Sequence, residues 1–317
     1  MATSKNKLKK LVIAGLDNAG KTSFLIVLRH KYNFRELVEN LKPTIKIEYT
    51  SFNYLNNWEK SFWDMGGQEQ YRTLYLEDPV YFEDTDFFYF FIDIQDNVSN
   101  LEIWINYLNE LLKIYRDLNY FNDIIICFNK FDPTLNDNRE YNDRINGIKS
   151  QIIQDHNFKF KFFKTSFYNI ASVSKAFSYA LNQLLNVDML YIFLKKLVNR
   201  LNASYSVLYN DSGLIISDYY NDTLNPKDYL EIITSQINED LTLIQKLVDH
   251  KTHFSMRLSH FDNNSEFIKK YTFGPNDFYL RIFAPILENE EINTVLENFR
   301  NELKYLFIEI KKNYKNY

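Results

Sequence analysis

Apolar positions in the first 186 residues form short continuous runs separated by stretches with helical spacing. Continuous runs predict strands covered on both faces, whereas the alternating run 45–52 predicts a half-exposed strand. Helices are expected at 23–31 and 100–117, the second with Ile103, Tyr107, Leu111 and Ile114 inward. The expected strands cover residues 11–14, 45–52, 59–63, 87–92, 124–128 and 158–163. This alternation predicts an α/β domain over residues 1–186, with a mostly parallel six-stranded sheet and helices on both faces.

The pattern changes after residue 186. Asp188 can cap a helix, and a hairpin is expected around Gly213. A long helix begins at Pro226 and runs to Val248, three short strands follow, and a last helix covers 290–312. The order helix, two strands, helix, three strands, helix predicts a smaller α+β domain over residues 187–317.

Composition places the chain among globular proteins. Its 317 residues exceed one typical domain, and 45% of them are hydrophobic, which is ample for packed cores. A formal net charge of −4 argues against a nucleic-acid binder, which would carry a basic stripe. The single cysteine, Cys127, lies in an apolar run and is expected in the core. A disulfide is therefore excluded, and the reducing cytoplasm is the expected compartment.

Three features bear on membranes. No run approaches the ~18 apolar residues of a membrane span. The first ten residues hold four lysines, for which a solvated tail is favoured over contact with anionic lipid. Ala2 excludes the N-terminal myristoylation signal. Membrane contact is thus expected to be peripheral, if it occurs.

Residues 15–22 carry the first chemical signal. They read Gly-Leu-Asp-Asn-Ala-Gly-Lys-Thr, which fits the phosphate-binding loop, and they stand between an expected strand and an expected helix. Backbone N–H groups and the helix dipole would hold an anion there. Lys21 would neutralise the outer phosphates, and the Thr22 hydroxyl would bind Mg²⁺. The alternative, a chance glycine turn, is disfavoured because four of the seven glycines fall in this loop and in Gly66-Gly67.

A second signal follows the strand expected at 59–63, in the sequence Asp-Met-Gly-Gly-Gln. Asp64 could hold Mg²⁺ through water, and Gly67 would let its backbone N–H approach a terminal phosphate. Gln68 could orient an attacking water. An ordinary acidic turn is the alternative, which the preceding phosphate loop makes less favoured.

Two further motifs suit guanine. Asn129, Lys130 and Asp132 follow the strand at 124–128, where an aspartate could accept from N1–H and the 2-amino group of guanine. Lys164-Thr165-Ser166-Phe167 follows the last strand and could offer a backbone N–H to the guanine oxygen. Ligands of open α/β sheets bind outside the carboxyl ends of the strands, where all these motifs fall. The residues expected to bind the nucleotide are Gly15, Leu16, Asp17, Asn18, Ala19, Gly20, Lys21, Thr22, Ser23, Thr44, Gly67, Asn129, Lys130, Asp132, Thr165, Ser166 and Phe167.

With these motifs the first half resembles a small GTPase of the Ras superfamily, and the Arf family most. The resemblance implies that Thr44 is the switch I threonine, which binds Mg²⁺ and senses the γ-phosphate, and that Gly67 and Gln68 belong to switch II. Arf proteins carry a lipidated glycine and an amphipathic helix at the N-terminus. This chain has Ala2 there, which argues against a membrane-inserting switch.

The element order of residues 187–317 is similar to the roadblock fold. A GTPase domain followed by such a module resembles the Rag/Gtr GTPases, in which the module serves dimerisation and docking. The chain departs from many Rag proteins by having Asn129, and we place it between Arf and Rag. His250, His253 and His260 are close in sequence, but solvated histidines are favoured over a metal site.

These inferences predict a GTP-binding switch with slow Mg²⁺-dependent hydrolysis, in which Lys21 and Gln68 are catalytic. A homodimer, or a heterodimer with a paralogue, is expected through residues 187–317. Two alternatives stay open: a non-catalytic nucleotide-bound scaffold and an Arf-like membrane-trafficking GTPase. Arg72 is a candidate for contact with a regulator, although a surface arginine is the simpler interpretation. The sequence does not identify the effector, the exchange factor or the activating protein.

Overall fold

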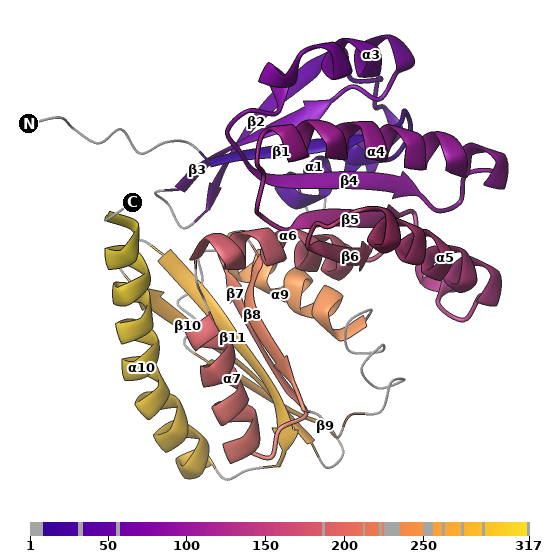
Figure 1. Cartoon of the computed structure of the whole chain (residues 1–317). Helices are drawn as coiled ribbons and strands as arrows, with labels where there is room; N and C mark the ends of the chain where they lie inside the picture. Colours follow the sequence, from indigo (N-terminus) through magenta and orange to yellow (C-terminus); the bar gives the residue numbers. More distant parts are fainter. Residues whose placement is uncertain are drawn as a thin grey trace, which may run out of the picture. The chain divides into compact units, whose positions relative to one another are not determined.

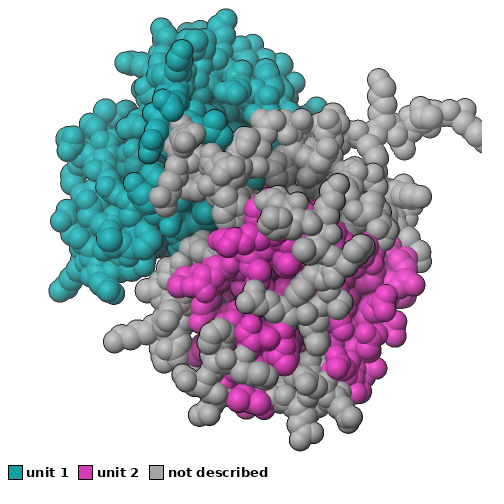
Figure 2. Space-filling model, turned by 180° about the vertical axis from the view of Figure 1, so that it is seen from behind, with its two compact units in different colours: residues 1–176 teal, residues 177–317 magenta. Residues whose placement is uncertain are grey.

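The computed structural model describes residues 9–30, 34–54, 58–185, 188–211, 213–221, 224, 235–249, 256–261, 264–273, 276–286 and 289–315. The chain divides into two compact units, residues 1–176 and 177–317 (Figure 2). The boundary lies inside helix α6 (Ile170–Leu185). The sequence placed it between residues 186 and 187, which lie outside the described residues, so that domain boundary stays a prediction.

The first unit is built on a six-stranded sheet in the order β2-β3-β1-β4-β5-β6 (Figure 1). Strand β2 runs antiparallel to β3, and the other neighbours are parallel. The strands are β1 (Lys9–Gly15), β2 (Ile47–Tyr54), β3 (Trp58–Met65), β4 (Thr85–Asp93), β5 (Ile124–Asn129) and β6 (Phe160–Lys164). The predicted α/β class and the mostly parallel six-stranded sheet are confirmed.

Aromatic residues of β4 show which helices cover each face of this sheet. Phe91 contacts Phe24 of α1, with ring centroids 4.9 Å apart. Its neighbour Phe90 contacts Tyr107 of α4, at 5.9 Å. Successive strand residues point to opposite faces, so α1 and α4 lie on opposite sides. The helices of this unit are α1 (Lys21–His30), α2 (Phe34–Glu39), α3 (Glu69–Glu77), α4 (Leu101–Asp117), α5 (Arg139–Asp155) and the start of α6.

One helix face differs from the prediction. Ile103 of α4 was expected inward, but it is 47% exposed. Tyr107 and Leu111 are buried as predicted, and the buried stripe of α4 also includes Trp104, Leu108 and Tyr115. The large aromatic side chains at 104 and 115 therefore rotate the packed face by about one position from the aliphatic pattern. Cys127 is fully buried, as predicted.

The second unit contains a five-stranded antiparallel sheet in the order β8-β7-β11-β10-β9. Its described elements follow the predicted order of helix, two strands, helix, three strands and helix. They are α7 (Asp188–Arg200), β7 (Tyr205–Asn210), β8 (Ile215–Tyr220), α9 (Ile237–Asp249), β9 (Met256–Phe261), β10 (Asn264–Phe273), β11 (Asn276–Pro285) and α10 (Asn289–Lys315). The first part of the helix expected from Pro226 lies outside the described residues, as do His250 and His253.

The two faces of this sheet carry different helices. Tyr209 of β7 donates a hydrogen bond to Asp240 of α9, at 3.1 Å. On the other face, Tyr271 of β10 donates to the Leu296 carbonyl of α10, at 3.2 Å. Helix α7 packs beside α10, where the rings of Phe193 and Phe299 lie 3.6 Å apart (Figure 1). In the described part of the chain, no helix has the length and apolar content needed to cross a membrane.

Candidate nucleotide-binding site

The loop between β1 and α1 has a backbone that its glycines make possible. Gly15 and Gly20 have φ of 149° and 80°, and Asn18 adopts a left-handed φ of 57°. A Cβ on Gly15 would lie 2.5 Å from the Phe91 carbonyl oxygen, so the tight packing of β1 on β4 also requires glycine. The loop therefore turns sharply into the N-terminus of α1, where backbone N–H groups are free of helical partners.

Lys21 crosses this loop from the first turn of α1. Its Nζ donates hydrogen bonds to the carbonyls of Gly15 at 3.1 Å and Leu16 at 2.8 Å. The side chain is buried, and burial lowers the pKa of Lys21 while the charges of Asp64 and Asp17 oppose that shift. The ammonium is thus held at the centre of the loop, beside the positions where phosphate oxygens would lie.

Three oxygen-bearing side chains from three segments meet next to the loop. The Thr22 hydroxyl lies 2.9 Å from the Thr44 hydroxyl and donates to Asp64 Oδ2 at 2.5 Å. Burial raises the pKa of Asp64 to about 6, against the opposing effects of Lys21 and Thr22. Among the residues that the structure describes, Asp64 Oδ1 is buried and has no hydrogen-bond partner. A carboxylate oxygen without a partner, beside two hydroxyls, is the oxygen-only chemistry that Mg²⁺ prefers, so the residues fit this ion.

A cavity of about 330 Å³ opens beside this cluster. Its lining residues are Asp17, Asn18, Ala19, Gly20, Lys21, Thr22, Ser23, Leu41, Lys42, Pro43, Thr44 and Gly67. The structure therefore brings the predicted phosphate-loop residues, Thr44 and Gly67 together, although they come from three separate parts of the chain.

Gly67 packs directly against the phosphate loop. A Cβ there would lie 2.3 Å from the carbonyl oxygen of Leu16, so this close approach requires glycine. Arg72 of α3 donates from Nε to the Gly67 carbonyl at 3.0 Å, and its guanidinium lies over the Tyr107 ring at 5.2 Å. Arg72 is thus half-buried and holds Gly67 in place, a role that the sequence did not indicate.

Gln68 occupies a different environment from its neighbour. It precedes the first turn of α3, and its Oε1 accepts a hydrogen bond from Gln70 Nε2 at 3.1 Å. The residues that line the cavity include Gly67 but not Gln68. The structure therefore places Gln68 next to the site without bringing its amide into the cavity.

Asn129 lies at the end of β5 and begins the first of the two motifs expected to bind guanine, residues 129–132, which is called the base motif below. It connects this motif to the phosphate loop. Its Nδ2 donates to the Ala19 carbonyl at 2.8 Å, and its Oδ1 accepts from the Thr165 hydroxyl at 2.9 Å. Asn129 is buried, and a Cβ on Gly20 would lie 2.3 Å from its Nδ2. The three predicted motifs are thus connected through this one amide.

The remaining base-motif residues form a second hydrogen-bonded group. The Ser166 hydroxyl donates to Asp132 Oδ1 at 2.6 Å, and Lys130 Nζ pairs with Asp93 Oδ2 at 2.6 Å. Lys130 has a left-handed φ of 59°. The ring of Phe167 packs on Tyr168, with centroids 4.2 Å apart. The sequence missed Asp93, although its place at the carboxyl end of β4, on the same edge as the other motifs, was the available signal.

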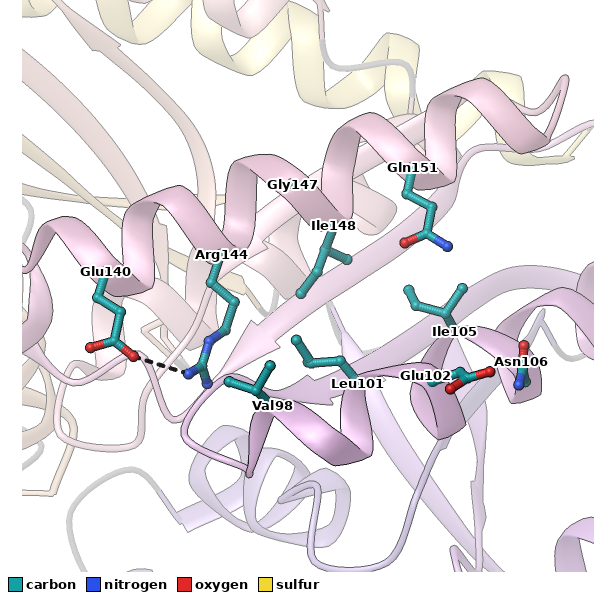
Figure 3. A pocket seen from close by; sticks show the side chains of 10 residues that line it. All are labelled: Val98, Leu101, Glu102, Ile105, Asn106, Glu140, Arg144, Gly147, Ile148 and Gln151. Carbon is teal, nitrogen blue, oxygen red and sulfur yellow. Dashed lines mark hydrogen bonds and ion pairs between the residues drawn. The ribbon is translucent and has the colours of Figure 1, made fainter.

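A larger cavity of about 770 Å³ lies between α4 and α5 (Figure 3). Its lining includes Val98, Leu101, Arg144 and Gly147, and none of the predicted nucleotide-binding residues. In Figure 3, Arg144 extends from α5 toward Val98, with Glu140 beside it at 3.3 Å. This cavity is therefore separate from the candidate site.

The fold and the site define a phosphate-loop nucleotide-binding protein of the small GTPase type. The family model described as "Gtr1/RagA G protein conserved region" matches residues 10–237. The chain belongs to this family.

Similarity to curated proteins extends to both groups that the motifs suggested. ADP-ribosylation factor-like protein 5 of Caenorhabditis elegans is 33% identical over 126 residues, which is 40% of this chain and 64% of that protein. GTP-binding protein GTR1 of Saccharomyces cerevisiae is 26% identical over 142 residues, 43% of this chain and 44% of that protein. For the first five such relatives the chain spans between 38% and 64% of their length.

Among solved structures, the Arl6 (BBS3) small GTPase of Trypanosoma brucei with bound GppNp is similar over 56% of this chain and 97% of that one. The sequence identity is 19% and the TM-score is 0.45. The placement between the Arf and Rag families is confirmed by the family model and the curated relatives.

Proposed function

We propose that this chain is a guanine-nucleotide switch that binds GTP with Mg²⁺ and hydrolyses it slowly. The observation that carries this proposal is the position of Asn129, whose amide contacts Ala19 of the phosphate loop at 2.8 Å and Thr165 at 2.9 Å. One connected set of side chains can therefore hold a purine base and its phosphates at the same sheet edge.

In this proposal the backbone of residues 15–20 and the Lys21 ammonium hold the β- and γ-phosphates. Thr22 and Thr44 bind Mg²⁺, and Asp64 does so through water. When bound, the ion supplies positive charge that offsets the charge developing on the phosphates. Lys21 contributes a second, fixed positive charge from its position inside the loop.

Hydrolysis requires a water placed in line with the bond to be broken. We assign its orientation to Gln68, because Gly67 beside it lies against Leu16 of the phosphate loop. The attacking water forms a bond to the γ-phosphorus, and the bond from that phosphorus to the β–γ bridging oxygen breaks, giving GDP and phosphate. Gln68 bonds to Gln70 in this structure and would have to reorient to reach that water.

Guanine selectivity is the first test. A site that hydrogen-bonds a particular donor can reject a base without it by up to ~10⁴-fold. Equilibrium binding of the full chain to GTP and ATP measures this ratio directly. An ATP affinity within roughly tenfold of the GTP affinity would contradict the proposal, given that expected ratio.

Asp132→Asn sharpens this test. The substitution replaces one acceptor by a donor, so xanthine nucleotides, which carry an oxygen at position 2, should replace guanine nucleotides as the preferred ligand. Retained preference for guanine in this variant would remove Asp132 from its assigned role. Asp123→Asn is the matched control, since Asp123 precedes β5 at the opposite end of that strand.

For the second unit we infer a roadblock-like docking domain that forms a dimer with a second copy or a paralogue. Its element order supports this inference, as do exposed apolar side chains on α7 and α10. These are Met189, Tyr191, Ile192, Tyr305 and Ile308, which are 42% to 60% exposed. A groove of about 420 Å³ lies between the two helices and includes Met189, Ile192 and Tyr305.

A nucleotide-bound scaffold without catalysis is the second candidate. The observation in its favour is that Gln68 is not among the residues lining the phosphate cavity. Single-turnover GTP hydrolysis by the purified full chain separates the two, because a scaffold would leave bound GTP intact over many hours. The Arf-like trafficking alternative predicts GTP-dependent co-sedimentation with liposomes, and the cytoplasmic location stays a prediction.

A further inference from the structure

Gln95 contacts the base motif although it belongs to neither of the motifs that the sequence revealed. It lies on the loop between β4 and the 3-10 turn η2 (Val98–Asn100). Its Nε2 donates to the Lys130 carbonyl at 2.6 Å and to Asp132 Oδ2 at 3.0 Å. An amide NH₂ has two hydrogens, so both donors of Gln95 are directed at the base motif.

The loop that carries Gln95 is held at its first residues by β4 and β5. Asp93 Oδ1 accepts the backbone N–H of Gln95 at 2.9 Å, while Asp93 Oδ2 pairs with Lys130. The Ile94 N–H donates to the Asn129 carbonyl at 3.1 Å. The backbone that leads into Gln95 is therefore fixed relative to the base motif.

Side chains from α4 and α5 hold the other side of the loop. Arg144 Nη1 donates to the carbonyls of Ile94 at 2.8 Å and Asp96 at 3.0 Å. The Asp96 carboxylate accepts from Trp104 Nε1 and from Asn100 Nδ2, each at 2.9 Å. Because the backbone at residues 94–96 is held and the Gln95 amide already bonds to Lys130 and Asp132 in this structure, Gln95 should lower the entropy cost of holding Asp132.

The chemistry of Asp132 explains what this contact would do. A carboxylate has about four lone-pair positions, two on each oxygen. Ser166 occupies one position on Oδ1 and Gln95 one on Oδ2. Each oxygen keeps a second position, and guanine has two donors, N1–H and the 2-amino group. With both oxygens fixed, the plane of the carboxylate is set so that it can meet both donors together.

We propose that Gln95 is a positioning residue of the guanine site, which orients the Asp132 carboxylate and thereby sets selectivity for the 2-amino group of the base. The inference rests on the proposed function of Asp132. Gln95 is exposed and lies outside the core, so we expect the protein to fold without its hydrogen bonds.

The test compares GDP with IDP, which lacks the 2-amino group, in equilibrium binding to the full chain. Gln95→Met keeps a similar side-chain shape and removes both donors. We expect its GDP affinity to fall roughly tenfold, the lower end for losing a hydrogen bond to a charged group, with a smaller loss for IDP. Gln95→Glu places a second carboxylate beside Asp132 and should weaken GDP binding further. Gln151→Ala, an exposed amide on α5, is the matched control and should leave both affinities unchanged.

The outcomes separate the two levels of inference. A GDP-to-IDP ratio that falls in Gln95→Met supports the positioning role. An unchanged ratio, whether or not both affinities drop together, overturns it, because a merely structural role would weaken both ligands alike. If the wild-type protein itself fails to prefer GDP over ADP, the proposed function fails instead. Unchanged thermal midpoints for both variants without nucleotide show that folding is intact.

Discussion

At the scale of single residues, the phosphate site brings opposite charges together in a buried place. Lys21 is 6% exposed and Asp64 is 1% exposed, and each is influenced by the charge of the other. Burying both charges has a desolvation cost that their attraction only partly offsets. Ligands that supply further charge, a phosphate for Lys21 and a cation for Asp64, would therefore bind to groups that already lack full solvation.

Replacing Lys21 and replacing Gln68 are expected to change different properties, namely GTP affinity and hydrolysis rate. Lys21→Ala removes a charge from the phosphate site and should weaken GTP binding itself, because charge-assisted contacts exist in the ground state. Gln68→Leu should leave GTP affinity nearly intact and slow hydrolysis, because the amide acts on the water. Equilibrium binding and single-turnover rates for both variants measure this. Loss of binding in both variants would contradict the assigned division of roles.

The residues of this site differ in how far the sequence reveals them. The phosphate loop is contiguous, so its spacing alone encodes the turn, the lysine and the hydroxyl. Gln95 reaches the Lys130 carbonyl 35 positions away, and Arg144 reaches the Ile94 carbonyl 50 positions away, so both contacts form only through the fold. A glutamine or an arginine alone carries no spacing signal. Arg72 was noted in the sequence as a candidate for regulator contact. Its hydrogen bond to the Gly67 carbonyl depends on how α3 packs and could not be predicted.

At the scale of elements, two glycines are expected to behave in opposite ways. A Cβ on Gly147, in the middle of α5, would meet no atom within 4 Å, so Gly147→Ala should stabilise the protein by about 0.5–1 kcal/mol. A Cβ on Gly67 would collide with the Leu16 backbone, so Gly67→Ala should displace the phosphate loop and weaken GDP binding. Urea unfolding and nucleotide titration measure the two effects. Equal GDP affinity in Gly67→Ala would show that the close contact with the loop is not maintained.

A buried charged group links α9 to the sheet of the second unit. Asp240 Oδ1 lies 2.9 Å from Arg281 Nε, and Arg281 Nη2 lies 2.9 Å from Glu266. Burial raises the pKa of Asp240 to about 7; Arg281 and the Tyr209 hydroxyl oppose the shift, while Glu266 and Glu239 add to it. One arginine faces two carboxylates, so protonation of Asp240 leaves a neutral Arg281–Glu266 pair.

This arrangement predicts a pH dependence. The folded-state pKa of Asp240 lies above the value of about 3.9 for an unfolded aspartate, so the folded state binds more protons between those two values. The free energy of unfolding should then fall as pH rises from about 4 to about 7. Asp240→Asn removes the titration and can still accept from Tyr209. Urea unfolding of both proteins at pH 5 and pH 8 should show that the variant gains stability relative to wild type at pH 8. If their difference in free energy of unfolding is the same at both pH values, the raised pKa of Asp240 is contradicted.

The elements themselves were predicted to different degrees. Continuous apolar runs such as 124–128 located the buried strands because both faces of those strands are covered. The face of α4 was wrong at Ile103 because aromatic side chains at 104 and 115 dominate its packing. Helices α3 and α5 were not predicted, although α5 buries Ile145, Ile148 and Ile152 at helical spacing, because three apolar positions in a 17-residue polar stretch give only a weak signal.

At the scale of the whole molecule, the chain combines a unit that has nucleotide chemistry with a unit whose described residues show none. Within the described part, no group of three or more His, Cys, Asp or Glu side chains is placed to hold a metal. The second unit instead has apolar side chains on the outside of α7 and α10. For the proposed switch, an assembly surface on the second unit would be the surface through which partners recognise its state.

The exposed apolar surface of α7 and α10 is the proposed site of this assembly. Burial of the α7 and α10 surface against a second copy should give a dimer in which about 1,600 Å² is buried in total, the usual size of a stable interface. Ile192 is 51% exposed and lines the groove between the two helices, and Ile192→Glu should weaken the dimer by roughly 30-fold or more, as expected when an apolar anchor costs ~2 kcal/mol. Ile103→Glu, at a similarly exposed isoleucine of α4 in the first unit, is the matched control and should leave the dimer intact. Sedimentation velocity of the full chain across micromolar concentrations measures both. A dimer broken by Leu247→Glu on α9 but not by Ile192→Glu would move the interface to α9, and a monomeric wild-type chain would refute the homodimer.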